Sequence, residues 1–237
     1  MRLAVGGEMI GISGRISRLS FLFVLLVPAS TMSAQGSVNG QVSLKEREGE
    51  QTEDLTDVTV WLEPTAPVKR LAPTVATIQL ERRQFTPRVR AVSEGSKIEF
   101  PNQDSFSHNV FSKAQNGAFD TGVYPRGRTH DQVFKEAGVF PIYCNIHPRM
   151  TGYVVVLNTP YFAQAGDDGR FHIGSVPAGT YTMHIWHDRA PEVSQKVTVL
   201  AAGLPVGRIE LDARGYRFVQ HKNKFGQEYT NANGDRY

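Results

Sequence analysis

The stretch GVFPIYCNIHPRMTGYVVVL, residues 138–157, contains Cys144, the only cysteine in the chain of 237 residues. Its first and last seven residues are rich in aromatic and β-branched side chains, and both segments read as β-strands. The residues between them form a tight loop, whose backbone is restricted by a proline. His147 lies three residues after the cysteine, and Met150 lies three residues further on. The stretch predicts two strands whose connecting loop aims a thiol, an imidazole and a thioether at one point.

The position of Cys144 predicts that its thiol meets the end of a sandwich core. Side chains alternate along a strand, so the cysteine shares a face with Phe140 and Ile142. A lone cysteine is usually a small buried hydrophobe, and this is the alternative to a role in metal binding. For Met150 the corresponding alternative is a core residue that enters the next strand.

The donor types of this loop favour copper. A thiolate and neutral imidazoles with a weak thioether suit an ion that alternates between Cu(I) and Cu(II). Structural zinc usually takes more than one cysteine, and methionine is rarely its ligand. A second imidazole has to come from another segment, and His108 opens a strand 36 residues before Cys144. We expect Asn109 to hydrogen-bond across to the cysteine loop and to hold the two segments in register.

The rest of the chain favours strands and turns over long helices, which predicts an all-β fold. Short runs between turn residues are expected to be strands at 38–44, 57–63, 76–81, 85–92, 96–100, 107–111, 130–134, 170–176, 179–186, 195–200 and 207–211. Residues 112–128 are rich in Gly, Asn and Arg, and we expect a long surface loop there. Residues 74–158 hold about seven of the strands, which is the number typical of a β-sandwich.

The pair His108-Asn109 together with Cys144-x-x-His147-x-x-Met150 resembles the cupredoxins, the type 1 blue-copper proteins, of the amicyanin and plastocyanin kind. The resemblance covers roughly residues 74–158 and implies a Greek-key β-sandwich. It implies one type 1 copper ion with His108, His147 and Cys144 as ligands and Met150 as the axial ligand. It also implies electron transfer through an exposed edge of His147, with a c-type cytochrome or a dehydrogenase as partner.

The segment 169–188 resembles carboxypeptidase regulatory-like domains, which are small sandwiches with an Ig-like or transthyretin-like arrangement. The residues that carry this resemblance are Gly169, Phe171, Ile173, Pro177, Gly179 and Tyr181. The simplest interpretation is one discontinuous domain, residues 36–66 and 160–213, into which the cupredoxin-like domain 74–158 is inserted. The alternative is that the flanks are extra strands on one enlarged sandwich. Residues 214–237 are a polar tail that is either disordered or lies over the surface.

Residues 1–34 have the form of a secretory signal peptide, with arginines, a short apolar run and then small residues. The run is much shorter than the roughly 20 apolar residues of a membrane span, so we expect no transmembrane span in the mature chain. Translation starts at Met1 or at Met9. The expected location is the periplasm or the exterior. Lys and Arg are scattered without a basic stripe, so we expect no nucleic-acid partner.

These patterns predict a periplasmic copper protein that carries single electrons between redox partners. Two alternatives stay open: copper binding or delivery without redox turnover, and a non-catalytic adhesion or carbohydrate-binding module. An enzyme is not expected, because no open metal position and no Ser/His/Asp or paired-carboxylate arrangement can be assigned. We expect the remaining histidines to be ordinary, namely His130, His172, His184, His187 and His221.

Overall fold

The computed structural model of the chain describes residues 6–7, 11, 34–52, 54–69 and 71–229. The predicted signal peptide lies almost entirely outside these residues, most of which belong to the compact unit Ser33–Tyr237. Within the described ranges every regular element is a β-strand, so the predicted all-β fold class is confirmed. The same ranges hold no helix with the length and apolar character needed to cross a membrane.

Two sheets, formed by strands from both ends of this unit, enclose a first hydrophobic core. The three-stranded sheet has the order β14 (Arg170–Pro177), β1 (Gln35–Lys45) and β17 (Leu204–Asp212). The four-stranded sheet has the order β13 (Phe162–Gln164), β2 (Thr59–Pro64), β15 (Gly179–His187) and β16 (Ala190–Val199). Val38, Val60 and Ile185, all 0% exposed, belong to the core between them. Strands that are far apart in the sequence therefore share these sheets and one core.

The residues between these flanking strands form three further sheets around a second core. The five-stranded sheet has the order β6 (Val89–Ser93), β12 (Thr151–Leu157), β11 (Gly138–Tyr143), β8 (His108–Ser112) and β9 (Phe119–Tyr124). The three-stranded sheet has the order β10 (Thr129–Val133), β7 (Lys97–Pro101) and β3 (Val75–Thr77). A hairpin joins β4 (Gln79–Glu81) to β5 (Gln84–Thr86). The two strands predicted from residues 138–157 are β11 and β12, which pair antiparallel.

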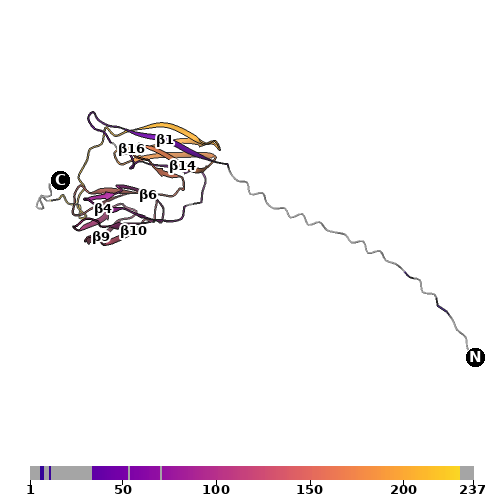
Figure 1. Cartoon of the computed structure of the whole chain (residues 1–237), viewed down its shortest axis with the longest axis horizontal. Coiled ribbons are helices and arrows are strands. Elements are labelled where there is room, and N and C mark those ends of the chain that lie inside the picture. Colours follow the sequence, from indigo (N-terminus) through magenta and orange to yellow (C-terminus); the bar gives the residue numbers. More distant parts are fainter. Residues whose placement is uncertain (1–5, 8–10, 12–33, 53, 70, 230–237) are drawn as a thin grey trace, which may run out of the picture. The chain divides into compact units, whose positions relative to one another are not determined.

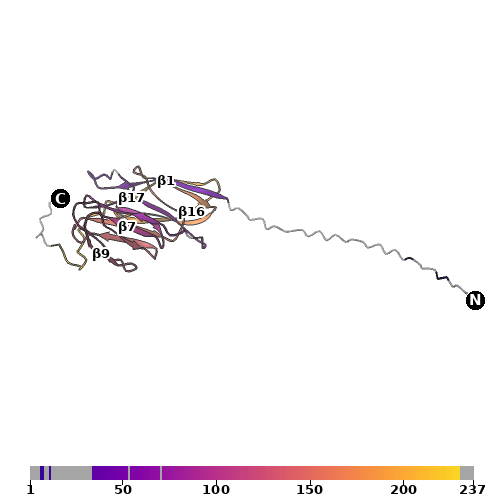
Figure 2. The same cartoon turned by 60° about the horizontal axis from the view of Figure 1, so that its bottom comes forward.

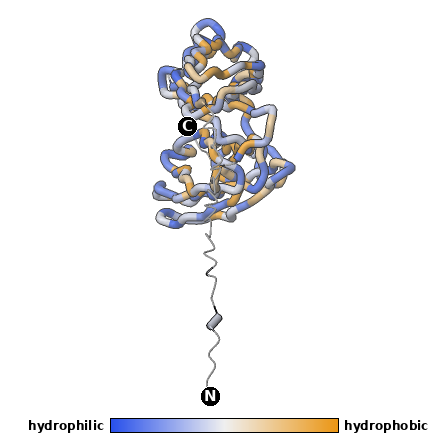
Figure 3. The backbone as a smooth tube through the Cα atoms, turned by 90° about the vertical axis from the view of Figure 1, so that its right-hand side faces the viewer, coloured by the Kyte–Doolittle hydropathy of each residue, from blue (hydrophilic) through white to orange (hydrophobic). Residues whose placement is uncertain are grey.

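A small third cluster joins the two cores. Strand β12 is buried on both faces, because Val154 faces the second core whereas Val155 and Leu157 belong to the third cluster. Trp61 of β2 and Trp186 of β15 pack against this cluster from the flanking sheet. In Figure 1 the strands β1, β14 and β16 form one group and β4, β6, β9 and β10 another, and Figure 2 shows the unit from a second side. Figure 3 shows that hydrophobic stretches, in orange, alternate with hydrophilic ones, in blue, along the chain.

Both ends of the middle segment are fastened to the same turn. The backbone N–H of Glu94 donates to the carbonyl of Leu157, and that of Lys97 donates to the carbonyl of Thr74, each at 2.9 Å. The hydroxyl of Ser96 accepts a hydrogen bond from the N–H of Thr74, also at 2.9 Å. The segment thus starts and ends at one place, as an inserted domain requires. Whether each part folds by itself stays a prediction.

Four strand predictions differ from the structure. The predicted strand 76–81 is divided into β3 and β4, which belong to different sheets. β9 lies within residues 112–128, where a surface loop was predicted; it is an edge strand with only one buried side chain, so its apolar alternation is weak. β13 was not predicted, since it has only three residues. The predicted strand 85–92 is divided into β5 and β6 around Pro87, which has no N–H to donate to a sheet.

Candidate metal centre

The four predicted ligands lie at one end of the second core. Cys144 directly follows β11, and His108 is the first residue of β8, the neighbouring strand. Two backbone hydrogen bonds close the loop between β11 and β12. They run from the N–H of Cys144 to the carbonyl of Met150 (3.2 Å) and from the N–H of Met150 to the carbonyl of His147 (3.0 Å). This tight loop and the start of β8 bring the donor-bearing residues into one region.

The structure brings three of these residues into direct contact. The Sγ atom of Cys144 lies 3.6 Å from Nδ1 of His108 and 3.5 Å from Nδ1 of His147, and all three donor atoms lie within 4.8 Å of one another. His108 and Cys144 are 0% exposed, and His147 is 4% exposed. Met150 is buried in the same core. Nitrogen and sulfur donors that converge away from water fit a copper ion in the ligand set predicted from the sequence.

Asp104 holds the ring of His108, a role that was not predicted from the sequence. Its Oδ2 atom lies 2.8 Å from Nε2 of His108. The same carboxylate accepts hydrogen bonds from the backbone N–H groups of Arg82 (2.7 Å) and Arg83 (2.9 Å). With Nε2–H donated to the carboxylate, the lone pair of Nδ1 faces the thiol, which is the orientation a metal ligand needs. Burial lowers the pKa of His108, and Asp104 acts to raise it.

Backbone groups surround the thiol of Cys144. Burial raises the pKa of this thiol, while hydrogen bonds from the backbone of Asn109, Ile146 and His147 act to lower it. The side-chain oxygen of Asn109 also accepts a hydrogen bond from the backbone N–H of Asn145, at 3.3 Å. The predicted bond between Asn109 and the cysteine loop is therefore confirmed.

The expected exposed edge of His147 is almost closed. Its ring packs against Phe106, with ring centroids 5.4 Å apart, and Phe106 also packs against His108 at 5.2 Å. The two imidazoles lie 4.7 Å apart. The ring of Phe106 covers part of the imidazole, so the exposed edge of His147 is narrow, with 4% of the residue reaching solvent.

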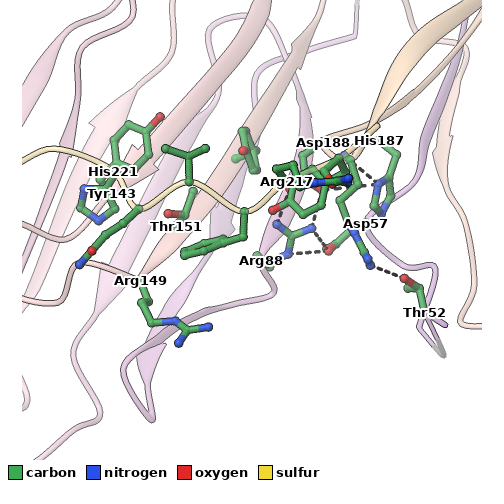
Figure 4. A pocket seen from close by; sticks show the side chains of 16 residues that line it. Thr52, Asp57, Arg88, Tyr143, Arg149, Thr151, His187, Asp188, Arg217 and His221 are labelled. Carbon is green, nitrogen blue, oxygen red and sulfur yellow. Dashed lines mark hydrogen bonds and ion pairs between the residues drawn. The ribbon is translucent and has the colours of Figure 1, made fainter. Parts of the chain in front are cut away.

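A second group of potential ligands, Asp57, His187 and Asp188, lies between the two cores and beside a cavity of 730 Å³ (Figure 4). Arg88 points between the two carboxylates: its Nε donates to Asp57 at 2.7 Å, and its two terminal nitrogens donate to Asp188 at 2.8 and 2.7 Å. A cation bound there would compete with this guanidinium for the same oxygens. We interpret the group as an ion-pair network.

Comparisons with known proteins give partial matches. The family model that matches is described as polysaccharide lyase family 4, domain II, and covers residues 154–204. Similar solved structures include a novel purple cupredoxin from Nitrosopumilus maritimus, 28% identical over 35% of this chain and 99% of that chain, with a TM-score of 0.32. A Cu-containing nitrite reductase (NirK) from Thermus scotoductus SA-01 is 28% identical over 41% of this chain and 26% of that chain, with a TM-score of 0.35. A proline-to-phenylalanine variant of amicyanin in its reduced state is 21% identical over 42% of this chain and 99% of that chain, with a TM-score of 0.34.

No curated protein matches the chain. The family model covers under a quarter of the residues, and the TM-scores are all low, so neither kind of match defines a family for the whole chain. The fold and the site define a class by themselves: an all-β sandwich protein with a buried group of two histidines and one cysteine.

Proposed function

We propose that the chain is a type 1 copper protein that carries single electrons in the periplasm and catalyses no reaction. The observation that carries the proposal is the convergence of the donor atoms of His108, Cys144 and His147 within 4.8 Å in a buried site. Bound copper would supply the one-electron couple between Cu(I) and Cu(II). The resemblance of the ligand pattern to cupredoxins supports the same proposal.

The residues of the chain would hold such an ion with little rearrangement. Cys144 and the two histidines supply the strong donors, and Met150 supplies a weak axial thioether. Asp104 fixes the ring of His108, and Asn109 ties its strand to the cysteine loop. Outer hydrogen bonds of this kind orient ligands and tune a metal site. A stiff shell favours electron transfer, because both oxidation states then use nearly the same positions.

The partner we propose is a c-type cytochrome or a dehydrogenase, and the signal-like residues 1–34 support the periplasm as the location. Electrons would pass through the narrow edge of His147, which lies beside Phe106 and Pro148. Small, weak interfaces suit such transient redox contacts.

We also propose that the copper-binding part, residues 74–158, is inserted into a carboxypeptidase regulatory-like sandwich of residues 36–66 and 160–213. The separate cores and the shared attachment of Thr74 and Leu157 to one turn support this division. In this arrangement Arg88, which bonds to two carboxylates of the outer sandwich, fastens the inserted part to its host.

The test is an optical spectrum of the full chain after addition of Cu(II). We expect an intense visible colour from thiolate-to-copper charge transfer. Cys144→Ser should abolish the colour and His108→Gln should weaken or shift it, because each removes a strong donor. His172→Gln is the matched control. His172 is an exposed residue of β14, in the flanking sheet, where its ring pairs with the side chain of Asn39, so the substitution should leave the spectrum unchanged.

A colourless wild-type Cu(II) complex would rule out the type 1 assignment. If the complex is coloured but exchanges electrons slowly and loses copper readily to a chelator, copper delivery replaces electron transfer as the function.

A further inference from the structure

The described part of the polar tail, residues 214–229, contains no strand and lies over the second core; we name it the strap. Its beginning is held by Arg47, which donates to the carbonyl of Tyr216 at 3.0 Å. Further along, Arg149 of the ligand loop lies 5.2 Å from the ring of Phe218. The ring of His221 then packs 4.7 Å from that of Tyr143, the residue before Cys144, and Figure 4 shows these two side by side. The strap thus reaches the loop that carries three of the candidate ligands.

Lys224 of the strap completes a closed ring of hydrogen bonds. Its backbone N–H donates to the side-chain oxygen of Asn145 at 2.8 Å, and the N–H of Asn145 donates to Asn109 at 3.3 Å. The amide of Asn109 donates to one oxygen of Asp120 at 2.6 Å. The ammonium of Lys224 donates to the other oxygen of Asp120 at 2.7 Å. Four residues from four separate segments therefore hold one another in place.

The ring lies directly behind the candidate ligands. Asn109 is the next residue after His108, and Asn145 is the next residue after Cys144. The hydroxyl of Tyr229 adds a hydrogen bond to the carbonyl oxygen of Cys144 at 3.1 Å. The strap therefore contacts the main chain of the thiol residue itself and links it to the strand of the first histidine.

Apart from a few ring contacts, the strap is held by polar contacts that are partly open to water, unlike those of the core. The side chain of Lys224 is 26% exposed and that of Asp120 is 40% exposed. Such partly exposed ion pairs contribute little to stability. A segment held in this way opens more readily than a packed sandwich, and it does so without global unfolding.

We propose that the strap is a working part of the metal centre. Lys224 and Tyr229 are positioning residues that hold the segments of His108 and Cys144 together and limit the access of solvent molecules to the thiol. The expectation that the strap slows the loss of copper rests on the proposed function. The expectation that the strap covers the loop of Cys144 does not.

The first experiment measures how fast N-ethylmaleimide alkylates the metal-free full chain at one fixed pH. Cys144 is the only thiol, so mass spectrometry reports its accessibility without ambiguity. Lys224→Met keeps the length of the side chain but removes the ammonium, and Tyr229→Phe removes only the hydroxyl. We expect each to raise the labelling rate several-fold, up to about tenfold, as the loss of one net hydrogen bond predicts.

Two variants control this experiment. Lys222→Met removes an exposed lysine of the same strap, which pairs with Glu228 at 3.5 Å, and should leave the rate unchanged. Lys224→Arg keeps the positive charge and should restore most of the protection. Wild-type labelling rates in both Lys224→Met and Tyr229→Phe, or an equal rise in Lys222→Met, would overturn the proposal.

The second experiment follows the transfer of Cu(I) from the loaded chain to a chelator, which should be faster in Lys224→Met by a similar factor. If the chain takes up no copper, the proposed function fails while the labelling result still decides the role of the strap. If copper binds with the expected colour but both rates are unchanged in the variants, the strap proposal fails alone.

Discussion

At the scale of single residues, one carboxylate organises the surroundings of the candidate site. Asp104 accepts hydrogen bonds from two backbone N–H groups and faces Nε2 of His108. Burial acts to raise the pKa of Asp104, but the backbone of Arg83, the His108 ring and the backbone of Arg82 together hold it below its usual value. The group is therefore an ionised acceptor at neutral pH, and it fixes which nitrogen of His108 faces Cys144.

We predict that Asp104→Ala weakens copper binding by about 10- to 100-fold, the range typical for the loss of an outer hydrogen-bond partner of a histidine ligand. The ring of His108 would then be free to turn or change tautomer. Competition with a chelator measures the affinity. Asp131→Ala is the control, because this carboxylate on β10 is 56% exposed and pairs with Lys97. Equal affinities in Asp104→Ala and wild type would show that Asp104 does not orient the ligand.

At the scale of elements, the hairpin formed by β4 and β5 has a turn in which neither central residue is a glycine although both have positive φ. Its two central residues, Arg82 and Arg83, have φ values of 55° and 59°. Turns with positive φ at both central positions favour Asn followed by Gly, because a β-carbon is crowded in this conformation. Here the carboxylate of Asp104 compensates by accepting hydrogen bonds from both N–H groups. The hairpin thus keeps a strained turn that is linked through Asp104 to the ring of His108.

Arg82→Asn should raise the free energy of unfolding by about 0.5–1 kcal/mol, because Asn adopts positive φ at lower cost. The side chain of Arg82 is 89% exposed, so little packing is lost. Denaturant titration gives the value. Arg126→Asn makes the same chemical change at an exposed position that lacks positive φ, and it should bring no gain. A loss of stability in Arg82→Asn would contradict the strain that we assign to this turn.

Much of the fold and of the candidate site could be predicted from the sequence. The remaining features depend on contacts between distant segments, which no local sequence pattern indicates. The strands β11 and β12 and the burial of Cys144 follow from alternation and from β-branched composition. The role of Asp104 is not predicted from the sequence, because Arg82 and Arg83 are brought to it only by folding and its own segment resembles an ordinary turn. The sequence does not decide the placement of the strap, because this segment lacks hydrophobic periodicity and its contacts are single polar bonds and isolated rings.

At the scale of the whole molecule, the contacts between the two cores include a small apolar cluster, the ion-pair network of Arg88 and hydrogen bonds of Gln164 with the backbone of Val89 and Ala91. Arg88 belongs to the middle segment, whereas Asp57 and Asp188 belong to the flanking one. Burial acts to raise the pKa of Asp188, but the guanidinium of Arg88 outweighs it and lowers this pKa. Because the pKa of Asp188 is lower in the folded than in the unfolded chain, its ionised carboxylate stabilises the fold at any pH above the unfolded pKa, which is about 4. This stabilisation is lost as the pH falls through the pKa of the folded chain.

We predict that Arg88→Met lowers stability at neutral pH by on the order of 2 kcal/mol, less than for a fully buried pair because Arg88 is 34% exposed. Calorimetry should show one transition for the wild type at pH 7 and two for the variant, as each core then unfolds by itself. Acidification below about pH 4 should separate the transitions of the wild type in the same way. Lys97→Met, which removes a charge within a single sheet, should keep one transition. A single transition in Arg88→Met would favour one enlarged sandwich over two joined domains.

The order of the strands along the chain also determines when each strand can pair during synthesis. β1 is made early, yet Gln41 on it pairs with Arg170, 129 residues further along, and the parallel partner β17 comes later still. The sheets of the second core, in contrast, draw all their strands from the span between β3 and β12. When this span folds, Thr74 and Leu157 at its two ends meet at the turn of Ser93 and Ser96. The loop that has to close before β1 can pair with β14 and β17 is then much shorter. Since closing a long flexible loop costs more entropy than closing a short one, we expect the middle segment to fold before the outer sandwich does.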